Sequence, residues 1–339
     1  MERQILNLYP IDYPFETLVS RAKAEPPKLI LNPEFQRKYK WDKDGFVRAS
    51  RFIESCLMRI PLPACYFAEN EQNNHSVIDG VQRITTIKKY FDDEFALEGL
   101  TVYQELNGKK FSELGDLKSE LESTTIRCII LRKENPKILV HEIFARLNQG
   151  AVKLSDQEIR HAIYPGVLDS LLTELGDIEF IANFRNSKEK EDRSNEELIL
   201  RFFALNDDLN DYDSNLTKWL DKYMIANQEI SPEKAEELKT EFIITLNKCT
   251  STFDRPFEDT NLQSPRQAVA YYDLLMWSFN KLTEEFVTEK REILNAKFKE
   301  LCQLDEFKRT MAGGLQQKTS ILTRRRLWNS KLEEIDGYN

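Results

Sequence analysis

The chain has 339 residues, of which 41% are hydrophobic, 11% aromatic and 31% charged, a composition typical of a folded protein with about two domains. Its formal net charge of −9 excludes a protein that coats nucleic acid by charge alone, because neutralising phosphates requires a surplus of lysine and arginine. No stretch approaches the roughly 20 apolar residues of a membrane helix, and the opening residues lack the zones of a signal peptide. The five cysteines are scattered and form no CxxC pair, so we expect reduced thiols, no zinc, no membrane partner and a cytoplasmic protein.

The first half of the chain alternates between two periodicities. Two segments carry apolar residues at helical spacing, namely residues 15–24 and 45–60. Four segments have the short apolar runs of strands, namely residues 28–31, 64–69, 75–79 and 124–132. We therefore expect a mixed α and β domain here, in which "VIDGVQRITTIKKYF", residues 77–91, changes from a strand into a helix.

From residue 135 onward the strand pattern almost disappears. Apolar stripes at helical spacing recur in residues 135–148, 195–205, 231–249 and 265–282. Pro165 and Gly166 interrupt the helical pattern. The sequence therefore predicts an α+β fold, with an α/β domain at residues 1–165 and an all-helical domain at residues 166–339.

Polar residues crowd the predicted passage from strand to helix. They are Asp79, Gly80, Gln82, Arg83, Thr85 and Thr86. Gly80 allows a close backbone turn, and the following helix presents N–H groups and its positive dipole end to that turn. An anion would be held there by N–H groups and by the guanidinium of Arg83, with two threonine hydroxyls within reach. A second interpretation stays open, in which Asp79 only caps the helix and Arg83 pairs with an acidic neighbour.

Two other clusters of polar residues are candidates for binding. In "NPEFQRKYKW", Gln36 and Arg37 are adjacent and could contact a phosphate or a base edge, although ordinary loop contacts explain them equally well. Trp41, at the end of that stretch, is interpreted as a packing anchor. In "IFARLNQGAVKLSDQEIRHAIY", residues 143–164, Arg146 and Asn148 lie at a predicted helix end, where they would be available to a ligand.

The same stretch also contains the start of a new helix. Ser155 and Glu158 have the spacing of a capping box, in which each residue hydrogen-bonds the backbone N–H of the other. We therefore favour a structural role for Glu158 over a catalytic one.

Several familiar chemistries are excluded by their missing motifs. The chain has no GxxxxGK[ST] phosphate loop and no GxSxG nucleophile elbow. Its three histidines, His75, His141 and His161, show no HExxH or HxH spacing, and none follows residue 161. Glu237 and Lys239 mimic a nuclease pair, but they lie in a strongly helical run without a strand.

In chain order, these motifs resemble the N-terminal domain of GmrSD-type modification-dependent restriction proteins, which is related in fold to ParB and sulfiredoxin. The resemblance covers roughly residues 12–205 and rests on "NPEFQRKYKW", "ESCLMRIPLP", "VIDGVQRITTI", "IFARLNQGAVKLSDQEIRHAIY" and "ELILRFFAL". The family signature is usually DGQQR. Here it is DGVQR, with Val81 in place of the first glutamine and the charged residues intact.

The resemblance implies a nucleotide-binding and hydrolysing domain of bacterial defence against modified phage DNA. Asp79, Gln82 and Arg83 match the signature and are the implied catalytic residues. The implied nucleotide-binding residues are Gln36, Arg37, Gly80, Thr85, Thr86, Arg146 and Asn148. Gln36 and Arg37 match the FQR element of the family. Arg146 and Asn148 match its later F.R.N.G element, which turns at Gly150. Larger members append a histidine-dependent HNH nuclease, so this chain resembles a standalone module whose DNA-cutting partner, if any, is another chain.

Two functions from different classes follow from these expectations. The first is a nucleoside triphosphatase that uses Mg²⁺, an ion often held by one carboxylate and the substrate phosphates. The second is a non-catalytic DNA-binding or sensor module, like ParB, that acts with an effector. A nuclease in its own right lacks its residues.

The helical half carries two conspicuous runs. "TRRRLWNSK", residues 323–331, is the best basic patch, although a solvated helix face is the favoured interpretation. "QAVAYYDLLMWSF", residues 267–279, offers a docking surface for a partner, but its aromatic residues more simply fill a helical interior. Those aromatic residues are Tyr271, Tyr272, Trp277 and Phe279.

Overall fold

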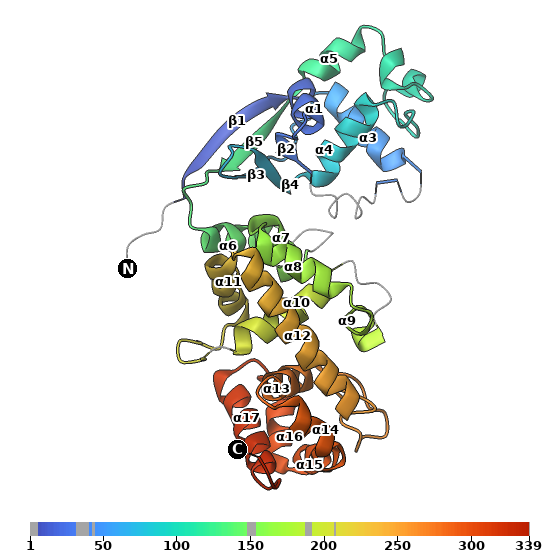
Figure 1. Cartoon of the computed structure of the whole chain (residues 1–339). Coiled ribbons are helices and arrows are strands. Elements are labelled where there is room, and N and C mark those ends of the chain that lie inside the picture. Colours follow the sequence, from blue (N-terminus) through green and yellow to red (C-terminus); the bar gives the residue numbers. More distant parts are fainter. Residues whose placement is uncertain are drawn as a thin grey trace. The chain divides into compact units, whose positions relative to one another are not determined.

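The computed structural model describes residues 6–31, 41–42, 45–147, 154–186, 192–206 and 208–338. The chain divides into two compact units, Met1–Leu154 and Ser155–Asn339. Within the described residues the first unit holds all five strands of the sheet, and the second is built of helices (Figure 1). The predicted α+β class is confirmed. In the part of the chain that is described, no helix has the length and apolar character needed to cross a membrane.

A five-stranded sheet forms the centre of the first unit. Its strands are β1 (Leu8–Pro14), β2 (Leu29–Ile30), β3 (Cys65–Glu69), β4 (His75–Asp79) and β5 (Thr125–Leu131). Their spatial order is β1-β5-β3-β4-β2. β1 pairs antiparallel with β5 and β3 antiparallel with β4, whereas β3 with β5 and β2 with β4 are parallel. β3 and β4 are thus internal strands, and the end of β4 at Asp79 is paired with β3.

This sheet shares one apolar core with the helices α1 (Phe15–Lys23), α3 (Val47–Leu57), α4 (Val81–Phe91) and α5 (Leu117–Ser123), and α6 (Lys137–Leu147) follows the last strand (Figure 1). The first unit also has 3₁₀ turns at η1 (Gln104–Leu106) and η2 (Phe111–Glu113). α4 follows β4 directly and buries Ile84, Ile87 and Tyr90 on one side. This spacing of three residues is the apolar stripe seen in the sequence, and it fixes the position of the helix N-terminus.

The second unit is a bundle of helices of varied length. They are α7 (Asp156–Ile163), α8 (Val167–Gly176), α9 (Glu179–Ala182), α10 (Ser194–Asn206), α11 (Leu216–Asn227), α12 (Pro232–Thr252), α13 (Val269–Phe279), α14 (Glu284–Glu289), α15 (Arg291–Gln303), α16 (Asp305–Ala312) and α17 (Lys318–Leu332), with one 3₁₀ turn at η3 (Phe184–Asn186). The boundary marked in the sequence at Pro165 and Gly166 lies beyond α7, which packs with α10 and α11 of this unit.

Two features of the bundle bear on the runs picked out in the sequence. α13 is buried on almost every side, so its aromatic residues belong to the interior, as the simpler interpretation expects. The basic run on α17 is not uniformly a solvated face, and for Arg324 that interpretation is wrong. Arg324 is buried and donates hydrogen bonds to the carbonyl oxygens of Thr310 (3.0 Å) and Leu315 (2.6 Å), because the C-terminal end of α16 and the loop after it need donors.

Candidate functional site

The turn between β4 and α4 has the strand, glycine and helix order that the sequence predicts. Gly80 is the N-cap residue of α4 and has a φ of 99°, a region that side chains rarely adopt. A Cβ atom at this position would come within 2.4 Å of the Cys65 Sγ. Glycine is therefore required twice, for its backbone conformation and for its close approach to β3. Because Gly80 has no side chain, it leaves the first N–H groups of α4 without a cap from that position.

Arg83 ties this turn to the chain that enters β3. Its guanidinium Nη2 lies 2.9 Å from Asp79 Oδ2 and 3.2 Å from the Ala64 carbonyl oxygen, and Nη1 donates to the Pro63 carbonyl oxygen. The Arg83 side chain is 13% exposed, whereas that of Asp79 is 44% exposed. The structure therefore contains the ion pair of the second interpretation, and Asp79 is the acidic neighbour of Arg83. A ligand at this turn would meet the Asp79 carboxylate and only one edge of the arginine.

The threonines lie deeper than the other residues of the motif. Thr85 and Thr86 are both buried, and the Thr86 hydroxyl donates to the Gln82 carbonyl oxygen at 2.8 Å. Within the described residues, the Thr85 hydroxyl has no hydrogen-bond partner. Gln82, on the first turn of α4, is half-buried. The side chains nearest the surface of the turn are therefore Asp79 and Gln82.

A pair of cysteines lies beneath the turn, and sequence reasoning did not place them there. Cys65 and Cys128 face each other across the parallel β3 and β5 strands, and both are buried. A hydrogen bond with Cys128 lowers the pKa of Cys65, the nearby charge of Arg83 acts in the same direction, and burial opposes them. The same hydrogen bond and burial raise the pKa of Cys128. No local signal reveals this arrangement, because it depends on the register of two strands that are distant in the chain.

The other predicted ligands are placed less centrally. Arg146 is on α6, which lies next to β4, and its largely exposed side chain pairs with Glu142 one turn earlier. Gln36, Arg37, Asn148 and Gly150 lie outside the described residues. Trp41 packs against Phe52, with ring centroids 5.4 Å apart, as expected of a packing anchor.

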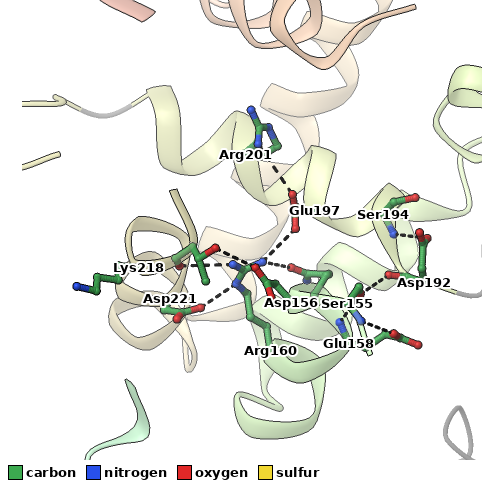
Figure 2. A network of polar contacts seen from close by, with 12 residues as sticks. Ser155, Asp156, Glu158, Arg160, Asp192, Ser194, Glu197, Arg201, Lys218 and Asp221 are labelled. Atoms are coloured by element: carbon green, nitrogen blue, oxygen red, sulfur yellow. Dashed lines mark hydrogen bonds and ion pairs between the residues drawn. The ribbon is translucent and has the colours of Figure 1, made fainter. Parts of the chain in front are cut away.

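The capping box at the start of α7 is confirmed. Ser155 Oγ accepts the Glu158 N–H at 3.1 Å, and Glu158 Oε2 accepts the Ser155 N–H at 2.7 Å (Figure 2). The structural role favoured for Glu158 from the sequence is therefore the observed one. Ser155 Oγ also donates to the Asp192 carbonyl oxygen, which connects this cap to the segment before α10.

Figure 2 also shows a buried network of charges beyond this cap. Arg160 lies 2.8 Å from Asp221 and 3.2 Å from Glu197, and Arg201 lies 3.9 Å from a second Glu197 oxygen. Arg201 also makes a forked pair with Asp273 of α13. Each arginine is matched by carboxylates that belong to other turns or helices. Buried arginine–carboxylate pairs of this kind hold helices in a fixed arrangement, and they are weak evidence for a ligand site.

One cluster in the second unit has the residue types of a metal site. Ligand atoms of His161, Asp169 and Glu196 lie within 4.8 Å of one another. The guanidinium of Arg193 occupies the space among them, since it lies 3.0 Å from His161 Nε2 and pairs with Glu196. A metal ion would have to displace that cation, so the cluster is interpreted as a second buried ion-pair network.

Comparison with known proteins connects the Gly80 turn with a family. The sequence-family model described as "GmrSD restriction endonuclease, N-terminal domain" matches residues 15–165. The matched range includes the whole turn and strands β2 to β5, whereas β1 ends just before it. No curated protein and no solved structure matches the chain.

Proposed function

We propose that this chain binds and hydrolyses a nucleoside triphosphate in bacterial defence against modified phage DNA. The proposal starts from residues 15–165, which make the chain a member of the GmrSD-type N-terminal domain family and so a module of restriction-system type. The nucleotide phosphates are assigned to the turn between β4 and α4. The DNA-cutting activity is assigned to a separate effector chain. Asp79, Gln82 and Arg83 are the residues that we expect to act on the phosphates.

One observation carries the assignment of the phosphate site. Gly80 brings the N-terminus of an eleven-residue helix directly off an internal strand without a capping side chain. Backbone N–H groups at such a terminus are oriented toward an anion, and the helix dipole favours negative charge there. Arg83 adds positive charge that is already oriented by Asp79 and by two carbonyl oxygens, so little side-chain entropy would be lost on binding.

The residues at the turn also fit a magnesium ion bound with the nucleotide. The Asp79 carboxylate is half-exposed, and the oxygen held by Arg83 is Oδ2, so we expect Oδ1 to be available to the ion. Magnesium is commonly held by one or two carboxylates together with substrate phosphates. The bound ion would neutralise phosphate charge. Asp79 would hold the ion, and Gln82 would orient an attacking water, a role that glutamine serves in other nucleotide hydrolases.

The decisive experiment measures nucleotide binding and turnover directly. The purified chain is incubated with ATP, GTP, CTP or UTP and Mg²⁺, with no DNA, plain DNA or modified DNA, and phosphate release is followed. Arg83→Ala should weaken nucleotide binding by about 1.5–3 kcal/mol, the range for losing a charge-assisted hydrogen bond. Because Arg83 also holds the Pro63 and Ala64 carbonyl oxygens, thermal unfolding is measured on the same sample.

A matched control exists on the same sheet. Arg127 also pairs with an aspartate, Asp12, through two hydrogen bonds of 2.6 and 2.9 Å, and lies outside the turn. Arg127→Ala should leave nucleotide affinity unchanged. Unchanged affinity in a folded Arg83→Ala variant would refute the phosphate assignment. If Arg83→Ala fails to fold, Asp79→Asn provides the test, and it should abolish Mg²⁺-dependent turnover.

The rival function is a DNA-binding or sensor module without catalysis. The same turn would then contact the sugar-phosphate backbone, as N–H groups at a helix N-terminus do in many DNA-binding proteins. DNA binding by the wild-type chain with no nucleotide binding and no phosphate release would favour this rival.

The assignment of cutting to another chain has its own test. No histidine follows residue 161, and His161 itself is held by Asp169 and Arg193, so a histidine-dependent nuclease in the helical unit would have no free histidine as ligand or base. The isolated chain should leave plasmid DNA intact. Mg²⁺-dependent plasmid cleavage that Asp79→Ala abolishes would overturn this division of labour and place the cutting chemistry at the turn itself.

A further inference from the structure

The helical unit contains a cavity whose charged lining is not explained by the packing of its helices. The cavity measures about 610 Å³ and lies where α10 ends and where α13 and α17 pack together. Its charged lining residues are Lys281, Lys318, Arg325, Arg326, Asp208 and Glu333. Positive charges therefore outnumber negative ones, in a protein whose net charge is −9. We call this feature the Trp277 cavity, after the tryptophan in its wall.

Two of the cations gather at one aromatic ring. The Lys281 Nζ lies 4.2 Å and the Arg325 Cζ 4.4 Å from the centroid of the Trp277 ring. Burial lowers the pKa of Lys281, and repulsion by Arg325 lowers it further. Burial also lowers the pKa of Arg325 to about 10. Each positive charge is thus held where it is less stable than in water, and an anion between them would relieve that cost.

The carboxylates nearby compensate this pair only in part, since the negative charge of Asp273 acts on Arg325. Among the described residues, neither Lys281 nor Arg325 forms an ion pair, and the guanidinium of Arg325 donates to the Leu205 carbonyl oxygen. Arg326 is paired with Glu306, outside the cavity lining. Asp208 is exposed and accepts from the Asn210 backbone N–H at 3.1 Å. The cation cluster at Trp277 therefore has unused capacity for an anion.

A neutral polar group points to the same conclusion. Asn206, the last residue of α10, also lines the cavity. Both the nitrogen and the oxygen of its side-chain amide are buried and lack hydrogen-bond partners in the described parts of the chain. Leaving a buried amide unsatisfied costs stability. A ligand with acceptor oxygens would use its N–H groups.

We propose that the Trp277 cavity is a second phosphate site, which takes a phosphate or a short phosphate chain from a small ligand between Lys281 and Arg325. Lys318 and Arg326 lie on the rim of the same cluster, and Asn206 donates from the wall. The lining supplies the ammonium, guanidinium and amide donors with which proteins hold phosphate oxygens. This site is independent of the Gly80 turn, since its residues all belong to the second unit.

The test uses a probe that reports on this cavity alone. The chain contains four tryptophans, Trp41, Trp219, Trp277 and Trp328, so full-length protein labelled with 5-fluorotryptophan should give four ¹⁹F NMR signals. Each is assigned by a single Trp→Phe substitution. Titration with pyrophosphate in the absence of Mg²⁺ should move the Trp277 signal saturably, and the midpoint should shift to higher concentration as sodium chloride is raised.

Lysine substitutions separate the proposed site from general effects of salt and charge. Lys281→Gln should weaken the pyrophosphate response by about tenfold, the scale of one charge-assisted contact. Lys222→Gln is the matched control, because Lys222 also lies over a tryptophan, Trp219, at 6.0 Å but lines no part of this cavity. Lys318→Gln is a second variant on the rim, expected to act in the same direction.

The outcomes are distinct. A saturable Trp277 shift that Lys281→Gln weakens and Lys222→Gln preserves establishes the site. ATP acting at lower concentration than pyrophosphate identifies a nucleotide as the source of the phosphate, and the reverse order identifies a free phosphate. No Trp277 shift, an equal shift in Lys281→Gln, or a shift only with DNA would overturn the proposal. Failure of nucleotide hydrolysis at the Gly80 turn would leave this measurement unaffected.

Discussion

At the scale of single residues, the signature turn combines binding groups with structural ones. Arg83 has the charge to bind a phosphate, but three of its contacts go to Asp79 and to carbonyl oxygens of the chain before β3. Gly80 has no chemistry of its own, yet its conformation sets where the helix starts. The loss of either residue therefore has two consequences, one for the ligand and one for the fold.

The first prediction concerns Gly80. Gly80→Ala should lower the free energy of unfolding by about 2–5 kcal/mol, because the backbone conformation costs roughly 1–2 kcal/mol for a residue with a Cβ and the contact with Cys65 adds overpacking of roughly 1–3 kcal/mol. Urea denaturation measures the change. Combining Gly80→Ala with Cys65→Ala should recover part of the loss, since it removes the Sγ that lies 2.4 Å from the added carbon.

A second glycine separates the two causes. Gly108 has a similar positive φ of 86°, but an added Cβ there would meet nothing within 4 Å. Gly108→Ala should therefore cost only the backbone contribution, about 1–2 kcal/mol. Equal losses for Gly80→Ala and Gly108→Ala would show that the approach to Cys65 has no energetic weight.

At the scale of elements, α3 anchors an irregular segment through one buried carboxylate. Glu54 accepts backbone N–H groups from Thr101 (3.0 Å), Val102 (2.7 Å) and Tyr103 (2.9 Å). Burial by itself would raise the pKa of Glu54, but the three N–H donors outweigh it and hold the pKa below the ordinary value of 4.5. The backbone N–H groups of a segment without regular secondary structure thus find their hydrogen-bond acceptor in a side chain of α3.

The second prediction is a pH dependence carried by this anchor. Glu54→Gln should destabilise the protein by about 1.5–3 kcal/mol at pH 7, since hydrogen bonds to a charged acceptor are lost. The folded-state pKa is depressed, so the contribution is fully present above the unfolded value of 4.5 and is lost as pH falls through the folded pKa. Denaturation curves are measured from pH 7 downward. The free energies of unfolding of wild type and variant should converge only at the acidic end of this range.

The control for Glu54 lies on α5. Glu120 is half-exposed and faces Arg59 at 3.7 Å, so Glu120→Gln should change stability by no more than about 0.5 kcal/mol at pH 7. A gap between wild type and Glu54→Gln that stays constant down to the most acidic folded condition would contradict the assignment of a depressed pKa to Glu54.

At the scale of the whole molecule, the distribution of charge limits how the chain can meet nucleic acid. The basic run on α17 supplies fewer free cations than its sequence suggests. Arg324 is buried, Arg326 pairs with Glu306, and Lys331 pairs with carboxylates on both sides. With a net charge of −9, a broad basic surface for DNA is not available from this run.

The third prediction follows from this distribution. DNA binding, where it occurs, should be weak and sensitive to salt, and should neutralise few phosphates. Fluorescence anisotropy with a labelled duplex gives log affinity against log salt concentration, and its slope should be shallower than about −6. A steeper slope would mean that a larger basic surface exists than the net charge suggests.

The amino-acid sequence by itself determined the features that depend on near neighbours in the chain. The strand, Gly80 and helix order was predictable because it uses adjacent residues, and the Ser155 and Glu158 capping box because it spans one helical turn. The α+β class and the helical second half followed from apolar periodicity, which each element carries within itself.

The tertiary structure alone decided which of several similar residues is buried, paired or left open. Arg324 and Arg326 are indistinguishable in the sequence, yet one satisfies carbonyl oxygens in the interior and the other pairs at the surface. Cys65 meets Gly80 because of strand register, and Lys281 and Arg325 meet over Trp277 because α13 and α17 pack together. Such contacts depend on the packing of distant segments, for which local periodicity holds no information.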